Sequence, residues 1–472
     1  MTDGHPRENA ASDPSAAGAV VDVPSVAKDL GQRFADAGHE LYLVGGSVRD
    51  MVLGRTAPDL DFATSAHPAE TTALLRGWAD RQYLLGVRFG TVGALKDGAR
   101  VEITTFRQEV YAQEHRKPSV TFGKDVATDL SRRDFAFNAM AVKLPDGTFV
   151  DPYGGVRDLA ARTLDTPLDP DVSFSDDPLR MVRAARFVAQ LEVTAAPRVV
   201  GSMRAMRERL GIVSPERIRD ELDKLLIAPH PAAGLELLVE SGVADVFLPE
   251  LGALRLEQDP VHRHKDVLHH TYAVVERTEP DLTLRLAALL HDIGKPATRE
   301  ITTDGVQFHH HEVVGARMAE KRMRALRYPS ATIEDVRTLV ELHLRFHGYG
   351  DGWSDAAVRR YVRDAGSLLD RLNQLTRADV TTGNEQRSRR FQGLQDELEE
   401  RIARLAEQEN LEALRPPLDG TQVMLHLGIE PGPLVGEALE YLMELRIERG
   451  PIDEEAAFEL LDGWARERGT PD

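Results

Sequence analysis

The sequence predicts an α/β region followed by a long α-helical region. Between about residues 24 and 165, short runs rich in β-branched and aromatic residues alternate with helical patterns. Beyond Pro178 nearly every segment has helical periodicity, and only the stretch TREITTDGVQFH predicts a short hairpin. A chain of 472 residues is too long for one hydrophobic core, so we expect two to four domains.

The composition is that of an ordinary globular protein. Hydrophobic residues make up 42% of the chain and charged residues 29%. No apolar run reaches about 18 residues, so we expect no membrane-spanning helix, and the N-terminus lacks the pattern of a secretory signal. The absence of cysteine excludes disulfides and thiolate metal sites and agrees with a cytoplasmic location.

The net charge of −19 by itself argues against a nucleic-acid partner. The charge is not evenly distributed, however. Residues 176–225 contain ten Lys and Arg against eight Asp and Glu. This mildly basic segment is a candidate surface for phosphates, and solvated helix faces explain the count equally well.

Within the α/β region, five runs predict strands: LYLV, TVGAL, RVEITTF, MAVKL and TFVDP. In LKDGARV and LPDGTFV an Asp-Gly pair separates two such runs, which predicts tight hairpins. The polar segment TFRQEVYAQEHRKPSV has little periodicity, so we expect an ordinary mobile loop there. Residues 1–22 are small, polar and aperiodic, so we expect them to be disordered.

A glycine pair follows the first expected strand. The order LYLV, Gly45-Gly46 and SVRDMVLG predicts a strand, a tight turn and a helix. The free N–H groups at such a helix start attract phosphate, and glycine allows the backbone to approach it closely. A Gly-Gly pair before a helix is in most proteins only a turn.

Two aspartates come next, in DLDFAT. On a strand Asp59 and Asp61 would project from the same face, where their charges repel unless a cation lies between them. Oxygen ligands select Mg²⁺ or Mn²⁺. Glu102, on the expected strand RVEITTF, is a candidate third acid if that strand pairs alongside.

Five motifs in order carry a family resemblance: GGSVRDMVLGR…DLDFAT, DLSRRDFAFNAMAV, DPYGGVRDL, DDPLRMVRAARF and SPERIRDEL. Together they resemble the class II tRNA nucleotidyltransferase and bacterial poly(A) polymerase family. The resemblance implies an elongated multi-domain protein with a polymerase-β-like nucleotidyltransferase head (α/β) and an all-α neck, body and tail. The implied parts are a disordered tail (1–22), the head (23–165), an RNA-binding neck (166–260), an HD-type metal-binding domain (261–381) and a helical tail (382–472).

The resemblance also implies roles in the head. Gly45 and Gly46 would face the triphosphate, and Asp59 and Asp61 would hold Mg²⁺ as catalytic residues, with Glu102 as the third acid. Arg49 matches an arginine of the same motif, although a pairing within its own helix explains it equally well.

In RRDFAFNAM, the expected positions of Asp134 and Asn138 are i and i+4 on one helical face, with Arg133 adjacent. In similar proteins this motif binds the ribose of the nucleotide. A 2′-OH both donates and accepts hydrogen bonds, which suits these side chains. An aspartate in the first turn of a helix needs no ligand to explain it.

Asp177 and Arg180 lie three residues apart at an expected helix start, so their side chains can reach out together. An acceptor beside a donor fits the amino edge of cytosine or adenine, whereas uracil and guanine would turn a carbonyl toward the carboxylate. An Asp-Pro pair that caps the helix is the alternative, with Asp176 as a further candidate for the cap. In SPERIRDEL, Ser214 and Pro215 predict another helix start.

A second set of motifs resembles the HD phosphohydrolase superfamily: HRHKDVLHHTYAVVE, AALLHDIGKPA, FHHHEVVGARMA, ELHLRFH and TRADVTTGN. His270, His291, Asp292 and Asp379 match its ligand pattern for a divalent metal of unspecified identity. His311 and His343 could extend the site to a second metal. Each histidine alone is typical of a surface or core position, and such domains are also retained for folding or RNA binding.

Together these patterns predict an enzyme that adds CCA to the 3′ end of tRNA, with CTP, ATP and tRNA as partners and no membrane. A poly(A) polymerase that uses ATP alone fits the same motifs. A third reading is an HD phosphohydrolase whose head is inactive. The oligomeric state is left open.

Overall fold

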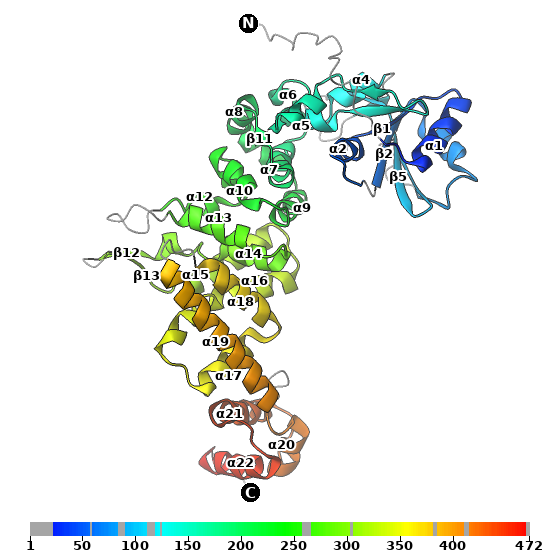
Figure 1. The fold of residues 1–472 in the computed structure, drawn as a ribbon. Coiled ribbons are helices and arrows are strands. Elements are labelled where there is room, and N and C mark those ends of the chain that lie inside the picture. The colour runs from blue at the N-terminus through cyan, green and yellow to red at the C-terminus, as the bar shows by residue number, and fades with distance from the viewer. Residues whose placement is uncertain are drawn as a thin grey trace. The chain divides into compact units, whose positions relative to one another are not determined.

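The structure is a computed structural model of the 472-residue chain, and it describes residues 22–56, 59–83, 90–110, 119–122, 125–256, 266–302, 305–380, 385–409 and 415–468. The chain divides into two compact units, Met1–Pro249 and Glu250–Asp472 (Figure 1). The division into five parts remains a prediction. The expected disordered tail lies outside the described residues except for Asp22.

The first unit contains a seven-stranded mixed sheet with the strand order β3-β4-β5-β2-β1-β8-β9. Strand β2 is antiparallel to β1 and parallel to β5, and β4 and β5 form an antiparallel hairpin. The strands are β1 (Leu41–Val44), β2 (Asp59–Thr64), β3 (Arg81–Tyr83), β4 (Thr91–Lys96), β5 (Ala99–Thr105), β8 (Ala141–Leu144) and β9 (Phe149–Val150). All five expected strands are present, and both Asp-Gly turns connect antiparallel pairs.

The sheet has one fully covered face and one partly covered face. The covered face packs its apolar side chains against α1 (Ser25–Asp36) and α3 (Pro68–Leu75), which makes the main core of the head. On the other face Ala63 belongs to a smaller cluster with Leu130 of α4 (Val126–Ser131). Because side chains alternate along a strand, Asp61 and Asp59 share the face of Ala63.

Helices make up most of the rest of the first unit. Apolar residues of α7 contact both α9 and α10, and α6 packs on α8. The short helices of the head are α2 (Gly46–Val52), η3 (Ala136–Asn138) and α5 (Gly155–Ala160). They are followed by α6 (Pro170–Asp176), α7 (Arg180–Leu191), α8 (Pro197–Met206), η4 (Arg207–Ile212), α9 (Pro215–Leu226), α10 (Pro231–Glu240) and α11 (Ala244–Phe247), and α12 (Pro249–Gly252) begins at the last residue of this unit.

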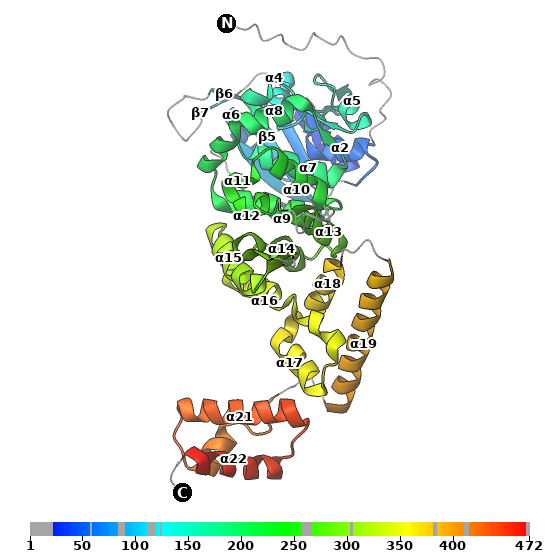
Figure 2. The same cartoon turned by 90° about the vertical axis from the view of Figure 1, so that its left-hand side faces the viewer.

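The second unit is helical apart from one hairpin. Figure 2 shows α19 running alongside α17 and α18, and α21 beside α22. Its elements are α13 (Val267–Arg277), α14 (Leu282–Leu290), η5 (Lys295–Thr298), β12 (Arg299–Thr302), β13 (Gly305–Phe308), α15 (His311–Ala325), α16 (Ser330–Leu342), η6 (Arg345–Asp351), α17 (Asp355–Ala365), η7 (Gly366–Leu368), α18 (Leu369–Asp379), α19 (Glu385–Glu409), α20 (Gly420–Leu427), α21 (Pro433–Arg449) and α22 (Glu454–Arg468). The hairpin β12–β13 confirms the expectation for TREITTDGVQFH.

Two expectations about secondary structure were wrong. The expected loop TFRQEVYAQEHRKPSV contains β6 (Arg107–Val110) and β7 (Ser119–Phe122), which pair antiparallel. Beyond Pro178, β11 (Thr194–Ala195) pairs in parallel with β10 (Thr163–Leu164). Both pairs depend on contacts that local periodicity does not record. Within the described ranges, none of the helices has the length and apolar character needed to span a bilayer.

Candidate active site and metal centre

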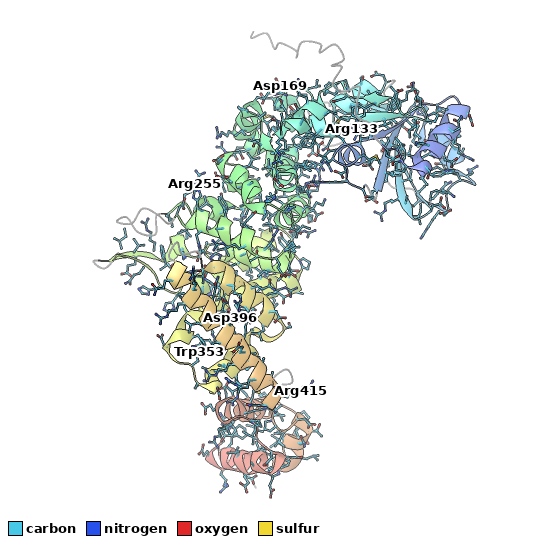
Figure 3. All side chains as sticks on the ribbon, viewed as in Figure 1. Arg133, Asp169, Arg255, Trp353, Asp396 and Arg415 are labelled. Carbon is cyan, nitrogen blue, oxygen red and sulfur yellow. The ribbon has the colours of Figure 1, made fainter. Side chains whose placement is uncertain are left out.

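The glycine pair forms the turn between β1 and α2. Gly45 has φ 75°, in the left-handed region, and α2 begins at Gly46, as expected. A Cβ on Gly45 would lie 2.6 Å from Nη1 of Arg133 and 4.0 Å from Oδ2 of Asp61. The turn therefore lies against residues of two other motifs, and only glycine leaves room for them. Arg133 is labelled in Figure 3.

The three expected acids lie on two paired strands. In the parallel register of β2 and β5, Asp61 lies opposite Glu102. Burial raises the pKa of Asp61, and the charges of Glu102 and Asp59 raise it further, while Arg133 opposes them. The side chain of Asp59 is 63% exposed and lies 3.9 Å from Arg100.

Ser47 holds the strand that carries both aspartates. Its buried hydroxyl donates to the backbone oxygen of Asp59 at 3.1 Å and accepts from the backbone N–H of Asp61 at 3.2 Å. The hydroxyl thus links α2 to the part of β2 that extends past its pairing with β1. The sequence analysis missed this contact, and the only local signal was a hydroxyl residue after the glycine pair.

The carboxylates of the head form an anionic site but not a tight ligand cluster. Among the described residues, groups of three or more closely spaced ligand atoms occur only in the second unit. The pKa of Asp61 is raised mainly by burial and further by the charges of Glu102 and Asp59, and a bound cation would offset both effects. The donor set of Asp59, Asp61 and Glu102 fits a hard divalent ion.

The expected helix through Asp134 and Asn138 is absent. Phe135 is extended, with φ −133° and ψ 153°, and only a short 3₁₀ turn follows it. The backbone N–H of Ala136 bonds to Asp165, and buried Phe135 and Phe137 anchor this course of the chain. The two polar side chains still meet, since Asn138 donates to Oδ1 of Asp134 at 2.9 Å.

Two arginines hold this pair. Arg183 of α7 donates to Oδ2 of buried Asp134 through Nε at 3.0 Å, and also through Nη2. Burial alone would raise the pKa of Asp134, but the guanidinium of Arg183 and the amide of Asn138 hold it below its usual value. Arg49 donates to Oδ1 of Asn138 at 2.8 Å and also pairs with Asp50 within its own helix.

The guanidinium carbons of three arginines lie near the ring of Phe187. Their distances from the ring centre are 5.2 Å for Arg49, 5.7 Å for Arg183 and 4.1 Å for Arg186. This packing joins α2 of the head to α7. Arg183 and Arg186 stand in the quoted motif DDPLRMVRAARF, but their partners could not be read from the spacing.

A cavity of about 400 Å³, within the size range of ligand pockets, lies between the sheet and α7. Asp177 and Arg180 both line it, as the base-reading hypothesis requires. Its lining consists of Thr91, Thr104, Asp129, Arg132, Arg133, Asp134, Asp177, Arg180 and Arg183. Of the expected head residues, Arg133, Asp134, Asp177 and Arg180 are in this lining and the others are not. The sequence analysis missed Thr91, Thr104, Asp129, Arg132 and Arg183.

The start of α7 differs from the expected Asp-Pro cap. The helix begins at Arg180 after Leu179, and Asp176 ends α6 instead of capping α7. Asp177 lies between the two helices and accepts from the N–H of Leu179 at 3.2 Å.

The side chains of the proposed base-reading pair have internal partners. Arg217 of α9 donates to Asp177 at 2.8 Å. Arg180 donates to Ser173 at 2.9 Å and to the carbonyl of Arg132 at 2.6 Å. Helix α9 begins with Ser214 and Pro215 as expected, and the contact of Arg217 agrees with the supporting role expected for this motif.

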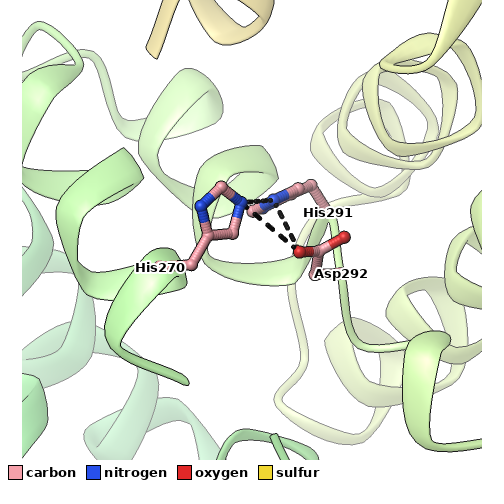
Figure 4. Close-up of side chains that lie close together, drawn as sticks. All are labelled: His270, His291 and Asp292. Atoms are coloured by element: carbon pink, nitrogen blue, oxygen red, sulfur yellow. Dashed lines mark hydrogen bonds and ion pairs between the residues drawn. The ribbon is translucent and has the colours of Figure 1, made fainter. Parts of the chain in front are cut away.

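In the second unit all six expected metal ligands lie together. Nε2 of His270 is 2.9 Å from Asp379 and 3.3 Å from Nε2 of His291, and Nε2 of His291 is 3.2 Å from Asp292 (Figure 4). Asp292 also belongs to a second group of close ligand atoms, with His311 and His343. Its Oδ1 is 3.4 Å from Nε2 of His311.

The histidines are oriented as metal ligands. Nδ1 of His291, His311 and His343 lies 2.8, 2.9 and 2.6 Å from backbone carbonyl oxygens of Ala288, Phe308 and Val340. A proton held on Nδ1 leaves the Nε2 lone pair free to bind metal. Nε2 of His311 and of His343 is buried without a hydrogen-bond partner among the described residues. These atoms fit a divalent ion.

Charge within this cluster is strongly coupled. Burial alone would lower the pKa of His291, but Asp292 and Asp379 raise it to about 10, so a divalent ion that binds here has to replace the proton on Nε2. Burial and the charge of His291 lower the pKa of His343 to about 3. Lys295 also pairs with Asp292, at 2.7 Å.

The fold and both sites agree with the comparisons to known proteins. The chain belongs to the tRNA nucleotidyltransferase and poly(A) polymerase family. Three family models match: the poly A polymerase head domain over residues 41–165, the probable RNA and SrmB-binding site of polymerase A over 193–254, and the HD domain over 266–409.

The A-adding tRNA nucleotidyltransferase of Deinococcus radiodurans is 35% identical over 444 residues, which cover 90% of this chain and 95% of that protein. The CCA-adding enzyme of Levilactobacillus brevis is 42% identical over 219 residues, or 46% of this chain and about half (54%) of that enzyme.

A solved structure has the same fold. The CCA-adding enzyme of Bacillus stearothermophilus in complex with CTP is 24% identical, with a TM-score of 0.68 over 95% of this chain and 99% of that one.

Proposed function

We propose that this protein adds C, C and A stepwise to the 3′ end of tRNA, using CTP and ATP and releasing pyrophosphate. The observation that supports this most is the placement of Asp59, Asp61 and Glu102 on paired strands, in the unit that holds the arginine-lined cavity. The similarity of most of the chain to a tRNA nucleotidyltransferase supports tRNA as the acceptor. We also propose a cytoplasmic location, where these substrates are available.

In the proposed reaction the 3′-OH of the RNA attacks the α-phosphate of the nucleotide, and the bond to pyrophosphate breaks. The turn at Gly45 and Gly46 and the guanidinium of Arg133 face the triphosphate, where N–H groups and positive charge balance the developing negative charge. Arg49 supports this side of the site through Asn138.

The carboxylates of Asp59 and Asp61 are the proposed ligands of Mg²⁺, with Glu102 as the adjacent third acid. Bound there, Mg²⁺ would lower the pKa of the attacking hydroxyl and neutralise charge on the departing pyrophosphate. Ser47 keeps the backbone of both aspartates in place.

Selection of the nucleotide is assigned to the cavity. Asp134, which lines it, is proposed to bind the ribose together with Asn138, which donates to Asp134 from outside the lining. The carboxylate of Asp177 would accept from the amino group of cytosine or adenine, and Arg180 would donate to the adjacent ring nitrogen. A carbonyl in place of the amino group would face a carboxylate, so UTP and GTP are rejected.

Purified protein tests this directly when it is given labelled CTP, ATP, UTP or GTP and tRNA that lacks its terminal triplet. The expected products grow by C, C and A and then stop, and Asp59→Ala abolishes growth. A matched control is Asp97→Ala, an exposed aspartate in the β4–β5 turn of the same domain, which should leave addition unchanged. Long A-only tails would instead support a poly(A) polymerase.

Addition of the final A alone is a second candidate, because the relative that matches 90% of the chain is named an A-adding enzyme. Acceptors that end before the first C, after one C and after both Cs separate the two. Growth of only the last acceptor, and only with ATP, would favour this candidate.

The second unit is proposed to hydrolyse phosphoesters. Its six clustered ligands would hold divalent metal, which supplies an activated water and polarises the phosphate. Purified protein is assayed on 2′,3′-cyclic nucleotides and 2′-nucleotides with different divalent ions. Asp59→Ala should leave this hydrolysis intact, and Asp292→Ala should remove it.

A further inference from the structure

One row of residues crosses the head sheet and ends at a proposed catalytic acid. The register places Tyr83 opposite Gly93, Gly93 opposite Glu102, and Glu102 opposite Asp61. Residues opposite each other on neighbouring strands point to the same face of a sheet. Tyr83 therefore lies on the face that carries the carboxylates, two strands from Glu102.

The ring of Tyr83 covers the strand between them. A Cβ on Gly93 would lie 2.2 Å from Cε2 of Tyr83, so the ring occupies the space that a side chain would fill. Burial raises the pKa of the Tyr83 hydroxyl, and the charges of Arg100, Glu102 and Asp59 act on it as well. The ring is thus a partly exposed platform beside the acidic site.

The next row on the same face is cationic and apolar. This row lies two residues away along each strand. In it, Arg81 lies opposite Leu95, Leu95 opposite Arg100, and Arg100 opposite Asp59. Arg81 is exposed, Leu95 is 37% exposed, and the side chain of Arg100 is 62% exposed. Two arginines beside an open aromatic ring stand out in a chain with a net charge of −19.

The cavity proposed for the incoming nucleotide lies in the opposite direction along the same strands. Thr91 and Thr104, which line it, form the row on the other side of Gly93 and Glu102. Asp61 and Glu102 therefore stand between the cavity and the row of Arg81 and Arg100, and Asp59 lies at the end of that row. A transferase needs its second substrate to approach the carboxylates from the side that the first leaves free.

We propose that Arg81, Tyr83, Leu95 and Arg100, here called the tyrosine platform, bind the single-stranded 3′ end of the acceptor RNA. Tyr83 stacks on the terminal base, and the two arginines contact the phosphates that precede it. Stacking does not depend on base identity, so one ring serves an acceptor whose last base changes as the chain grows. This inference rests on the proposed function and names the acceptor subsite of the same active site.

The stacking is tested with a full-length tRNA acceptor whose 3′-terminal base is 2-aminopurine, a fluorophore quenched by stacking. Wild-type protein and Tyr83→Phe should quench it, whereas Tyr83→Ala should not. Loss of the stack should raise KM for the acceptor about 5- to 150-fold, with KM for CTP and ATP unchanged. A rise in KM for the nucleotide alone, or an unchanged acceptor KM, would overturn the proposal.

Gly93→Ala tests the same ring without altering it, because the new methyl would displace the ring. The variant should match Tyr83→Ala in quenching and acceptor KM, and adding it to Tyr83→Ala should have no further effect. The melting temperatures of Tyr83→Phe and Tyr83→Ala are also measured. Equal values would show that a difference in quenching or in acceptor KM does not come from unfolding. Additive effects of the two substitutions would contradict the proposed position of the ring.

The phosphate contacts are tested by salt dependence. Arg81→Ala should lower the slope of log affinity against log salt by about 0.7, the value for one phosphate of a single strand. Arg76→Ala is the matched control, since Arg76 is an exposed arginine at the end of α3, which packs on the opposite face. Equal slopes for the two variants would show that the arginines of the platform do not contact the phosphates.

The proposed function and the tyrosine platform can be refuted separately. If wild-type protein adds no nucleotide to any acceptor, the proposed function fails. If wild-type protein adds nucleotides and Tyr83→Ala does so with the same acceptor KM and quenching, only the tyrosine platform fails.

Discussion

Gly45→Ala should lower the rate of nucleotide addition by more than the accompanying loss of unfolding free energy can explain. Gly45 has φ 75° and ψ −138°, a combination that a residue with a Cβ adopts only at a cost of about 1–3 kcal/mol. The new Cβ would also lie 2.6 Å from Nη1 of Arg133, about 1 Å closer than van der Waals contact allows. The guanidinium is the flexible end of its side chain, so it should move away, and Asp61 would lose the cation that opposes its raised pKa.

Gly54→Ala separates the two effects. Gly54 has φ 70°, close to that of Gly45, but a Cβ there meets nothing within 4 Å. Both variants should therefore lose unfolding free energy, by about 1–3 kcal/mol, because each forces a residue with a Cβ to a positive φ. A displacement of about 1 Å at reacting groups lowers rates about 100-fold, so only Gly45→Ala should lose activity on that scale.

The measurements are urea unfolding and single-turnover nucleotide addition at saturating CTP and acceptor. Equal losses of activity in the two variants would show that backbone strain alone accounts for the effect. Full activity in Gly45→Ala would show that the approach of Arg133 to the turn has no catalytic consequence.

Three further outcomes are expected. Asp134→Asn removes the carboxylate that pairs with Arg183, which keeps its longer contact to Glu221 (3.7 Å), and should cost about 3 kcal/mol. Because the folded pKa of Asp134 is depressed, this contribution is present above the unfolded pKa of about 4 and is lost as pH falls through the folded value. Unfolding in urea from pH 7 to 3 should show the difference from wild type shrinking on acidification, and a constant difference would contradict the ion pair. Asp61→Asn should lower addition about 100-fold or more without changing hydrolysis by the second unit, and parallel loss of both activities would refute separate sites. His343→Ala should reduce bound metal per chain by about one ion in elemental analysis, whereas His426→Ala, whose ring bonds Asp462 rather than any of the six ligands, should not; equal metal content in the two variants would argue against a second ion.

Local sequence patterns were sufficient for five strands of the head sheet and for its two Asp-Gly turns, but not for β3, β6 and β7. Alternating apolar residues and Asp-Gly pairs predict strands and hairpins through interactions within a few residues, and these elements form where expected. The glycine turn and the positions of Asp59 and Asp61 on one strand face follow from the same short-range rules. The six histidine and aspartate ligands were selected by motif order rather than by geometry.

Other expectations failed where long-range contacts override local preference. The pair Asp134 and Asn138 was expected on a helix, but buried aromatic rings and a hydrogen bond from Ala136 to Asp165 hold the chain extended before it. Helix α7 begins at Arg180 rather than at Pro178, and Asp177 accepts both from the N–H of Leu179 and from Arg217, 40 residues away in the chain. Propensity cannot anticipate such partners.

The sequence by itself determined which side chains are available for chemistry, because motif order and strand alternation depend on neighbours in the chain. Only the tertiary structure decided what those side chains meet: Arg183 on Asp134, Ser47 across the backbone of two aspartates, and the ring of Tyr83 over Gly93. The physical reason is that strand register and helix packing are set by burial over the whole unit. Contacts between segments tens of residues apart are therefore absent from any local pattern.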